Sequence, residues 1–406
     1  MSARSERNPP VGLARLISAL GVAQIISWGT LFYAIAVLGD AMRDELGISA
    51  TWLFGAFTVG LLLSGIVSPA VGRLVDARGG RFVLSWGSIV GALSLAILAL
   101  ARDYATLFVG WALAGVAMAA CLYDPAFATL HQLTGARYRR AVTALTLFGG
   151  FASTVFWPLS QWLLDGVGWR GALWVYAALH VAVCLPLHAW FVPAHAGGVA
   201  EPLDPNPPST IASAAEAPRA ASGAAYHALA WAFAAAAFLS ATLSAHLIAV
   251  LKSAGLTPGD AVLVSSLIGP MQVAGRIAEF SFAHRLSALS VGALAFVLMT
   301  AALACLVLVD GLSAIAFVFA VLYGWSNGIM TIVRGTVPAV LFGHRNYGAL
   351  LGRLALPAFL AKAVAPVAFT LVLAAGMARV SALWLLIAVS VLALIAYRAA
   401  VRRREA

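Results

Sequence analysis

Charged residues are scarce in this chain: Asp, Glu, Lys and Arg make up 10% of its 406 residues, and the acids number 15. Soluble globular domains carry about 25% charged residues, so a soluble enzyme or binding module is excluded. Cysteine is scarcer still, because Cys121, Cys184 and Cys305 stand alone inside apolar runs. That spacing gives neither a disulfide framework nor a structural metal site, and we expect no metal and no cofactor.

Hydrophobic residues make up 62% of the chain, and its mean hydropathy is +0.95. Apolar runs repeatedly exceed the ~18 residues that mark a membrane-spanning helix. The sequence therefore predicts an all-α integral membrane protein that crosses the lipid bilayer with twelve transmembrane helices. Their approximate ranges are residues 14–38, 51–72, 82–101, 105–131, 141–163, 171–192, 227–251, 259–280, 289–309, 312–336, 347–375 and 380–398.

The formal net charge is +10. The cations gather in alternate loops, which indicates membrane orientation and not a nucleic-acid partner. With a cytoplasmic N-terminus, the cytoplasmic side holds eighteen cations, namely Arg4, Arg7, Arg15, Arg73, Arg78, Arg81, Arg137, Arg139, Arg140, Arg219, Arg276, Arg285, Arg345, Arg353, Arg398, Arg402, Arg403 and Arg404. The other side holds five, namely Arg43, Arg102, Arg170, Lys252 and Arg379. This excess predicts two cytoplasmic termini and, with no cleavage pattern, an uncleaved N-terminus.

A proline-rich segment at residues 193–225 predicts a flexible cytoplasmic linker. It divides the chain into two six-helix bundles, residues 1–192 and residues 226–406. Gly171–Trp174 opens the sixth span much as Ser381–Trp384 opens the twelfth. These matches predict two parallel repeats.

The segment Gly72–Arg81 joins the second and third spans, and we expect it to form a short turn at the cytoplasmic face. It carries Gly72, Asp76, Arg78, Gly79 and Arg81, so one acid stands among several arginines. A similar junction recurs half a chain later at Gly275–Glu279, which again indicates duplication.

Gly72–Arg81 resembles the major facilitator superfamily signature G-x-x-x-D-R-x-G-R-R, although Ala77 and Gly80 replace usual basic residues. The resemblance implies the twelve-helix fold of a secondary transporter. It also implies that Asp76 contacts the cytoplasmic start of helix eleven and acts as a conformational latch. Arg353 stands where that contact would need a cation, or else it anchors helix eleven at the lipid headgroups.

Two further resemblances concern the subgroup, which stays open. Trp28–Thr30 and Tyr138–Ala141 are similar to monocarboxylate and oxalate:formate porters, although Met271 or Gln272 replaces their substrate-handling arginine of helix eight. Cys121–Pro125 is similar to bacterial members associated with arsenite efflux, as is the segment Phe156–Leu159.

Ions inside the bilayer cost at least about 2.5 to 3.5 kcal/mol, so they mark polar sites more often than lipid contacts. Lys362 lies near the middle of helix eleven, too far from either end to reach the headgroups. It either binds solute or contacts carbonyls freed by the nearby prolines of helix eleven. Nine residues separate it from Arg353, which places the two on opposite faces of the helix.

Asp124 is the acid well inside a span, and it either carries a proton or caps a helix break at Pro125. Arg334 either pairs with Asp124 or reaches the headgroups. His246 suits proton transfer but equally suits packing. Gln24 and Trp28 lie one turn apart on helix one, where they either line a solute pocket or pack among aromatic residues.

These residues predict a monomeric secondary transporter that moves a small solute across a bacterial inner membrane by alternating access, coupled to protons. Two intramembrane cations against one acid favour an organic anion. An efflux pump for drugs or arsenicals is one alternative, and a transport-inactive membrane sensor is another. The chain lacks a phosphate-binding loop and catalytic clusters, so we expect neither ATP drive nor an enzyme.

Overall fold

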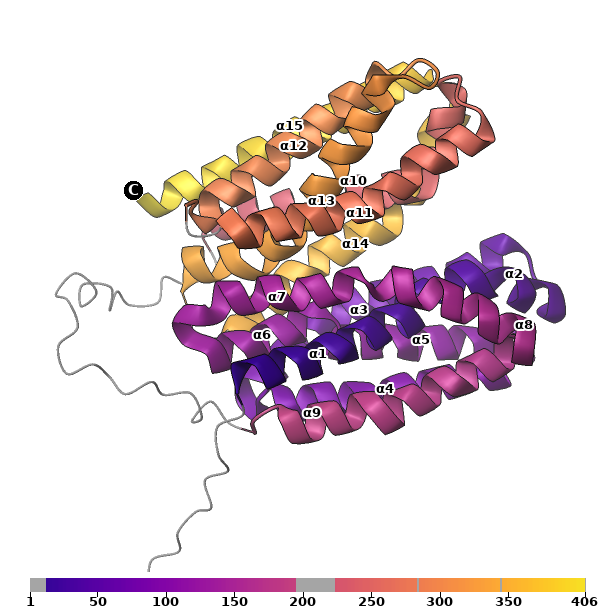
Figure 1. The fold of residues 1–406 in the computed structure, drawn as a ribbon, viewed down its shortest axis with the longest axis vertical. Coiled ribbons are helices and arrows are strands. Elements are labelled where there is room, and N and C mark those ends of the chain that lie inside the picture. Colours follow the sequence, from indigo (N-terminus) through magenta and orange to yellow (C-terminus); the bar gives the residue numbers. More distant parts are fainter. Residues whose placement is uncertain (1–11, 195–222, 283–284, 344, 406) are drawn as a thin grey trace, which may run out of the picture.

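The computed structural model describes residues 12–194, 223–282, 285–343 and 345–405, and within these ranges it contains helices and no strand (Figure 1). The N-terminal half comprises α1 (Leu13–Trp28), the π-helical turn η1 (Gly29–Tyr33), α2 (Ile35–Leu46), α3 (Ala50–Arg78), α4 (Gly80–Leu100), α5 (Tyr104–Cys121), α6 (Tyr123–Thr134), the 3-10 turn η2 (Gly135–Arg137), α7 (Tyr138–Gly150), α8 (Ala152–Leu179), the π-helical turn η3 (His180–Cys184) and α9 (Leu185–Phe191). The C-terminal half comprises α10 (Ala224–Ser253), α11 (Pro258–Phe282), α12 (Ala288–Val307), α13 (Ala314–Phe342), α14 (Tyr347–Ala374) and α15 (Arg379–Glu405).

The all-α membrane fold is confirmed. In the described part of the chain, 10 segments are long and apolar enough to cross a membrane, and one of them, Tyr104–Phe191, runs for 88 residues. An uninterrupted helix of that length would reach about 130 Å, far beyond a hydrocarbon core of ~30 Å. The segment is interrupted between spans at Gly135, which has φ 49° and opens the 3-10 turn η2, and at Gly168, which has φ 71°. It therefore holds the three predicted spans between residues 105 and 192, which brings the total to twelve.

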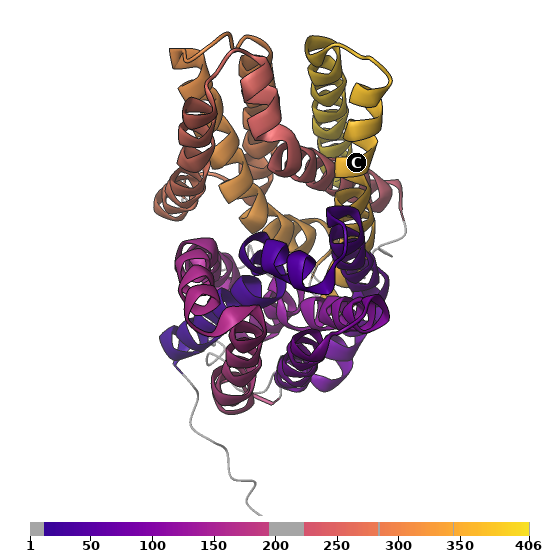
Figure 2. The ribbon, with the colours of Figure 1, turned by 90° about the vertical axis from the view of Figure 1, so that its right-hand side faces the viewer.

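The two halves lie side by side, the N-terminal half in indigo to magenta and the C-terminal half in orange to yellow (Figures 1 and 2). They meet where α3 packs along α14, α7 packs on α11 and α13, and α6 packs on α14. Most of the predicted linker at 193–225 falls outside the described residues, as do Arg4, Arg7 and Arg219. The predicted division of the chain at this linker therefore stays a prediction.

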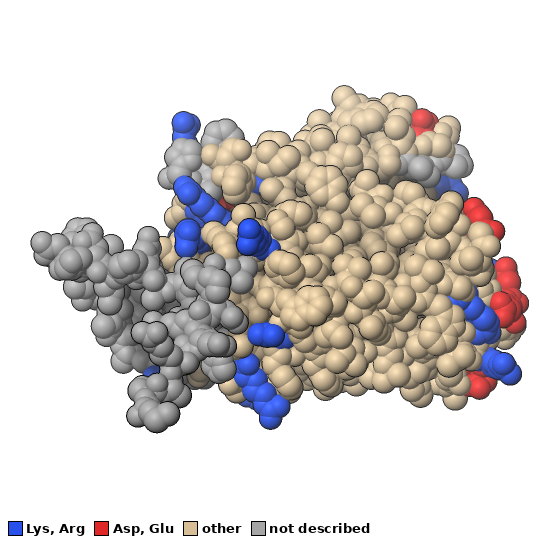
Figure 3. Space-filling view, turned by 60° about the horizontal axis from the view of Figure 1, so that its bottom comes forward, with Lys and Arg blue, Asp and Glu red and all other residues tan. Residues whose placement is uncertain are grey.

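On the face that Figure 3 shows, the charged side chains gather at the two ends, with an uncharged belt between them. The belt carries exposed large apolar side chains, among them Trp162, Leu371 and Val367, as expected of a surface that faces lipid. We call the end where α1 begins and α9 ends the basic end, because arginines dominate it in Figure 3. The other end is called the opposite end.

The expected turn at Gly72–Arg81 is much shorter than predicted. Helix α3 continues through Arg78, only Gly79 leaves helical geometry, at φ 80°, and α4 begins at once. A left-handed glycine suffices to reverse the chain because it has no Cβ to clash. The related segment Gly275–Glu279 is likewise no turn, since it lies inside α11.

Candidate functional site

Lys362, in the middle of α14, reaches from the C-terminal half to aromatic rings of the N-terminal half. Its Nζ lies 4.3 Å from the ring centroid of Phe32 and 5.9 Å from that of Trp28. A desolvated ammonium over an aromatic face gains electrostatic energy from the ring quadrupole. Among the described residues Lys362 contacts these rings and forms no hydrogen bond to a carbonyl of α14, so the expected contact with freed carbonyls is not seen.

The rings beneath Lys362 belong to an aromatic cluster of the N-terminal half, which we define as Trp28, Phe32, Tyr33, Phe57, Tyr123 and Trp157. Trp28 lies 5.3 Å from Phe32 and 5.2 Å from Tyr123, between ring centroids. The π-helical turn η1 begins directly after Trp28 and contains Phe32 and Tyr33. Single π-helical turns occur often at functional sites, where the extra residue changes the direction of side chains.

Asp124 of the N-terminal half faces Arg334 of the C-terminal half, with 3.6 Å between Oδ1 and Nη2. Both side chains are partly exposed, at 20% and 33%. Asp124 lies in the first turn of α6, which begins directly after the extended residue Leu122. No side chain caps the start of α6 by a hydrogen bond, so the expected capping role of Asp124 is not seen. Of the two alternatives expected for Arg334, the structure shows the pairing with Asp124, and the charge of Lys362 also acts on Asp124.

Arg276 is a third cation at this interface, and sequence analysis missed it by assigning it to a cytoplasmic loop. It lies within α11, is 5% exposed, and donates from Nη1 to the Thr146 carbonyl of α7 at 2.9 Å. Its charge also acts on Tyr33 and Tyr123 of the aromatic cluster. Its position inside the predicted span 259–280 was the signal that could have identified it.

Asp76 of α3 grips the start of α14, as the family resemblance implies. Its Oδ1 accepts a hydrogen bond from the Gly348 N–H at 2.8 Å, and its Oδ2 accepts one from the Ala349 N–H at 2.7 Å. The expected cation does not take part: Arg353 lies over the Tyr226 ring of its own half, 5.5 Å from the centroid. The free N–H groups and the positive dipole at a helix N-terminus already satisfy a carboxylate, so no arginine is needed.

A second carboxylate latch, not foreseen from the sequence, holds the start of α7. Glu279 of α11 accepts hydrogen bonds from Arg139 Nη2 at 2.7 Å and from Thr143 Oγ1 at 2.8 Å, and its side chain is 1% exposed. Tyr138, beside Arg139, donates to the Gly335 carbonyl of α13. These contacts and that of Asp76 join the halves at the basic end, and we call them the basic-end latches.

Two expected site residues, Gln24 and His246, form hydrogen bonds within their own halves of the molecule. Gln24 is fully buried and donates to the Cys121 carbonyl at 2.7 Å, so it supports the break between α5 and α6 and does not line a pocket with Trp28. His246 Nε2 lies 3.0 Å from the Pro366 carbonyl of α14, which also accepts a hydrogen bond from the Thr370 hydroxyl at 2.9 Å. Neither contacts Lys362 or Asp124 in the described structure.

Comparisons with known proteins agree with this geometry. The family model of the Major Facilitator Superfamily matches residues 20–304. Monocarboxylate transporter 13 of Rattus norvegicus is 29% identical over 170 residues, 41% of this chain and 38% of that protein. Monocarboxylate transporter 11 of Mus musculus is 34% identical over 119 residues, 29% and 27% of the two chains. The chain therefore spans well under half the length of these curated relatives.

Solved structures extend the likeness to the whole fold. The fucose:proton symporter FucP of E. coli superimposes with a TM-score of 0.70 at 14% identity, covering 95% of this chain and 98% of that one. The human organic anion transporter MFSD10 gives 0.68 at 16% identity, covering 96% and 99%. With a family match across most of its length and twelve spans in the expected arrangement, this chain is a multi-pass membrane protein that belongs to the Major Facilitator Superfamily, a family of transporters.

Proposed function

We propose that this transporter carries a small organic anion and that Lys362 binds its anionic group. The observation that carries the proposal is the position of Lys362, a cation of one half held 4.3 Å from the Phe32 ring of the other. Asp76 and Glu279 are occupied in the basic-end latches, so Lys362, Arg334 and Arg276 outnumber the remaining interface acid, Asp124, and this excess attracts negative charge. The relatives named monocarboxylate transporters support the same solute class.

The coupling ion in this proposal is a proton, and Asp124 carries it. A proton on Asp124 removes the charge that faces Arg334, which then becomes available to the solute. Both residues belong to the interface because one comes from α6 and the other from α13. Solute binding and proton binding therefore both change contacts between the two halves, whose relative movement produces alternating access.

The basic-end latches support a proposed state in which the solute enters from the opposite end. Asp76, Glu279 and Tyr138 each bond across the halves at the basic end. We place the basic end in the cytoplasm of a bacterial cell, with both termini there and the protein acting as a monomer in the inner membrane. The excess of arginine at this end supports that orientation.

Binding and flux of radiolabelled monocarboxylates in proteoliposomes test the proposal. Lys362→Ala should abolish binding, whereas Lys252→Ala, at the chain's other and exposed lysine, should leave it unchanged. Asp124→Asn should keep binding and exchange but lose the response to a pH gradient. Wild-type affinity in Lys362→Ala would contradict the solute site, and pH-driven accumulation by Asp124→Asn would contradict the coupling role.

The same assays separate the alternatives. A sensor would bind solute without flux in either direction. An efflux pump for cationic drugs would keep its ligand when Lys362 is removed, because a cation gains nothing from that ammonium.

A further inference from the structure

One cavity of the described structure lies away from the proposed solute site, where α3 turns into α4 at the basic end. It has a volume of about 450 Å³ and is lined by Arg78, Arg81, Phe82, Ser85, Trp86, Ile89 and Ala194. This size lies within the range of ligand pockets. Helix α4 is on the side of the N-terminal half that faces away from the C-terminal half (Figure 1).

One side of the cavity is an apolar wall built by a single stripe of α4. Phe82, Trp86 and Ile89 follow one another at spacings of four and three residues, so they share a face of the helix. They are 42%, 40% and 51% exposed, although all are large and apolar. Such a wall at the membrane boundary is suited to a lipid acyl chain, with tryptophan at headgroup depth.

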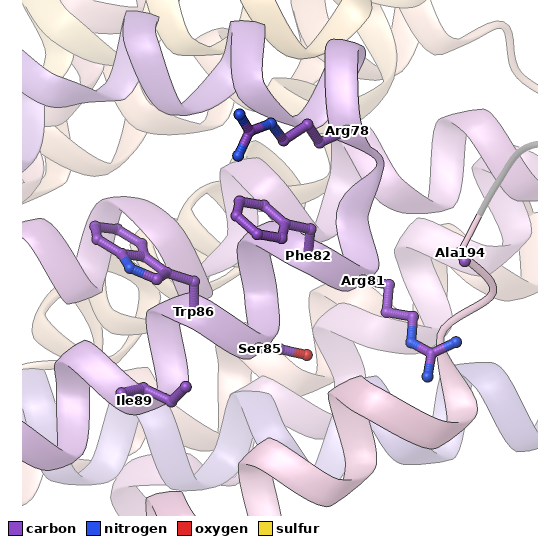
Figure 4. Close-up of a pocket in the computed structure, with 7 residues that line it drawn as sticks. All are labelled: Arg78, Arg81, Phe82, Ser85, Trp86, Ile89 and Ala194. Atoms are coloured by element: carbon purple, nitrogen blue, oxygen red, sulfur yellow. The ribbon is translucent and has the colours of Figure 1, made fainter.

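The other side of the cavity is basic. Figure 4 shows the Arg78 side chain above the Phe82 ring, the Arg81 side chain pointing away from Arg78 on the other side of Phe82, and the Ser85 oxygen turned toward the Arg81 side. The Arg78 guanidinium is 5.0 Å from the Phe82 ring centroid. Neither arginine forms an ion pair with any residue that the structure describes. These two cations are therefore available to a ligand.

Ser85 adds a polar group that the protein leaves unused. Its Oγ is buried and has no hydrogen-bond partner among the described residues. Buried hydroxyls normally have a partner, so an unsatisfied one that lines a cavity points to a bound group. Two guanidinium groups and one hydroxyl beside an apolar wall match a phosphate attached to an acyl chain.

We infer that this cavity binds one anionic phospholipid. The phosphate lies beside Arg81 with Ser85 as a further donor, Arg78 adds positive charge from the other side of the Phe82 ring, and an acyl chain follows Phe82, Trp86 and Ile89 along α4. The negative charge of a membrane leaflet attracts basic segments, and the cavity gives that attraction a fixed place. The inference is independent of the transported solute, because none of these residues contacts Lys362, Asp124 or the aromatic cluster in the described structure.

Native mass spectrometry of the purified full chain tests the site with dioleoyl phosphatidylglycerol and dioleoyl phosphatidylcholine. The wild type should retain the first lipid in preference to the second. The double variant Arg78→Gln/Arg81→Gln should weaken that retention by about fivefold to thirtyfold, given the usual effect of a cation at a membrane surface. The matched variant Arg137→Gln/Arg140→Gln removes two exposed arginines of the same end outside the cavity and should behave as wild type.

Crosslinking locates the lipid without removing a charge. Benzoylphenylalanine at Trp86 should crosslink phosphatidylglycerol more efficiently than the same group at Trp190, an exposed tryptophan of α9 outside the cavity. Free glycerol phosphate should not compete, because it lacks the acyl chain. Equal retention of the two lipids by wild type, equal retention by the two double variants, equal crosslinking at both positions, or full competition by glycerol phosphate would each overturn the inference.

Discussion

The Asp76 carboxylate is held by backbone N–H groups and not by a cationic side chain. Its two oxygens accept from the N–H groups of Gly348 and Ala349 at 2.8 and 2.7 Å. Hydrogen bonds to a charged group contribute about 1.5 to 3 kcal/mol each. The nearby arginines of the signature are not its partners in the described structure, and two of them, Arg78 and Arg81, line the lipid cavity.

Replacing Asp76 with asparagine removes the charge and one acceptor while preserving the size of the side chain. We expect solute flux to fall about tenfold, because the loss of ~1.4 kcal/mol from one conformational state changes its population by that factor. Equilibrium binding of the solute should stay within about twofold. Asp310→Asn, at an exposed acid, serves as the control; abolished binding in folded Asp76→Asn protein would contradict the role of a latch.

Some site residues could be predicted from their position in a span alone, whereas others could be identified only once their contact partners were known. Lys362 and Asp124 could be selected from the sequence because a charge in mid-membrane is costly. The contact of Asp76 with helix eleven came from the family resemblance. Arg276 and Glu279 looked like loop residues, since no hydropathy pattern tells whether the end of a helix faces water or a neighbouring bundle.

At the scale of elements, α3 and α14 cross with their backbones nearly touching. A Cβ at Gly72 would overlap the Gly348 carbonyl oxygen, and one at Gly352 would overlap the Ser68 carbonyl oxygen. Glycine is therefore required at this crossing by contact and not by backbone conformation. The amphipathic pattern of a membrane helix does not specify such a crossing, which explains why sequence placed the spans but not their partners.

Gly72→Ala should separate α3 from α14 and thereby weaken the bond of Asp76 with the start of α14. Overpacking of this kind typically costs about 1 to 3 kcal/mol, so we expect a lower Tm as well as reduced flux. Gly55→Ala in the same helix is the matched control, because a Cβ there meets nothing within 4 Å. Identical Tm and flux in the two variants would refute the close crossing.

The second latch should behave as one unit formed by α7 and α11. Glu279→Gln and Arg139→Gln each break the same buried ion pair, whose Nη2 to Oε1 distance is 2.7 Å. Loss of one partner from a buried pair costs about 3 to 5 kcal/mol, so both single variants should be clearly destabilised in thermal unfolding.

Combining the two changes should cost less than the sum of the single effects, because neither charge is then left alone. Strict additivity of the changes in unfolding free energy would show that Glu279 and Arg139 act independently. Gln161→Ala/Asp165→Ala, at an exposed pair of α8, provides a control cycle in which little coupling is expected.

For the whole molecule, the charges at the ends of the bundle determine the orientation. An even number of spans places both termini on one side, and the arginine excess predicts that this side faces the cytoplasm. A reporter that is active only outside the cytoplasm should be inactive when fused after Ala406. The same reporter fused after Gly376, between α14 and α15 at the opposite end, should be active; activity after Ala406 would reverse the orientation.

The two carboxylate latches differ in which second mutations could restore them after a first one. Glu279 binds side chains, so a lineage that acquires arginine there can recover when Arg139 changes to an acid. Asp76 binds N–H groups that almost every residue type supplies, and no substitution at positions 348 or 349 can offer it a replacement charge pair. Revertants of Glu279→Arg should therefore include second-site changes at Arg139, whereas revertants of Asp76→Asn should restore an acid at position 76 itself.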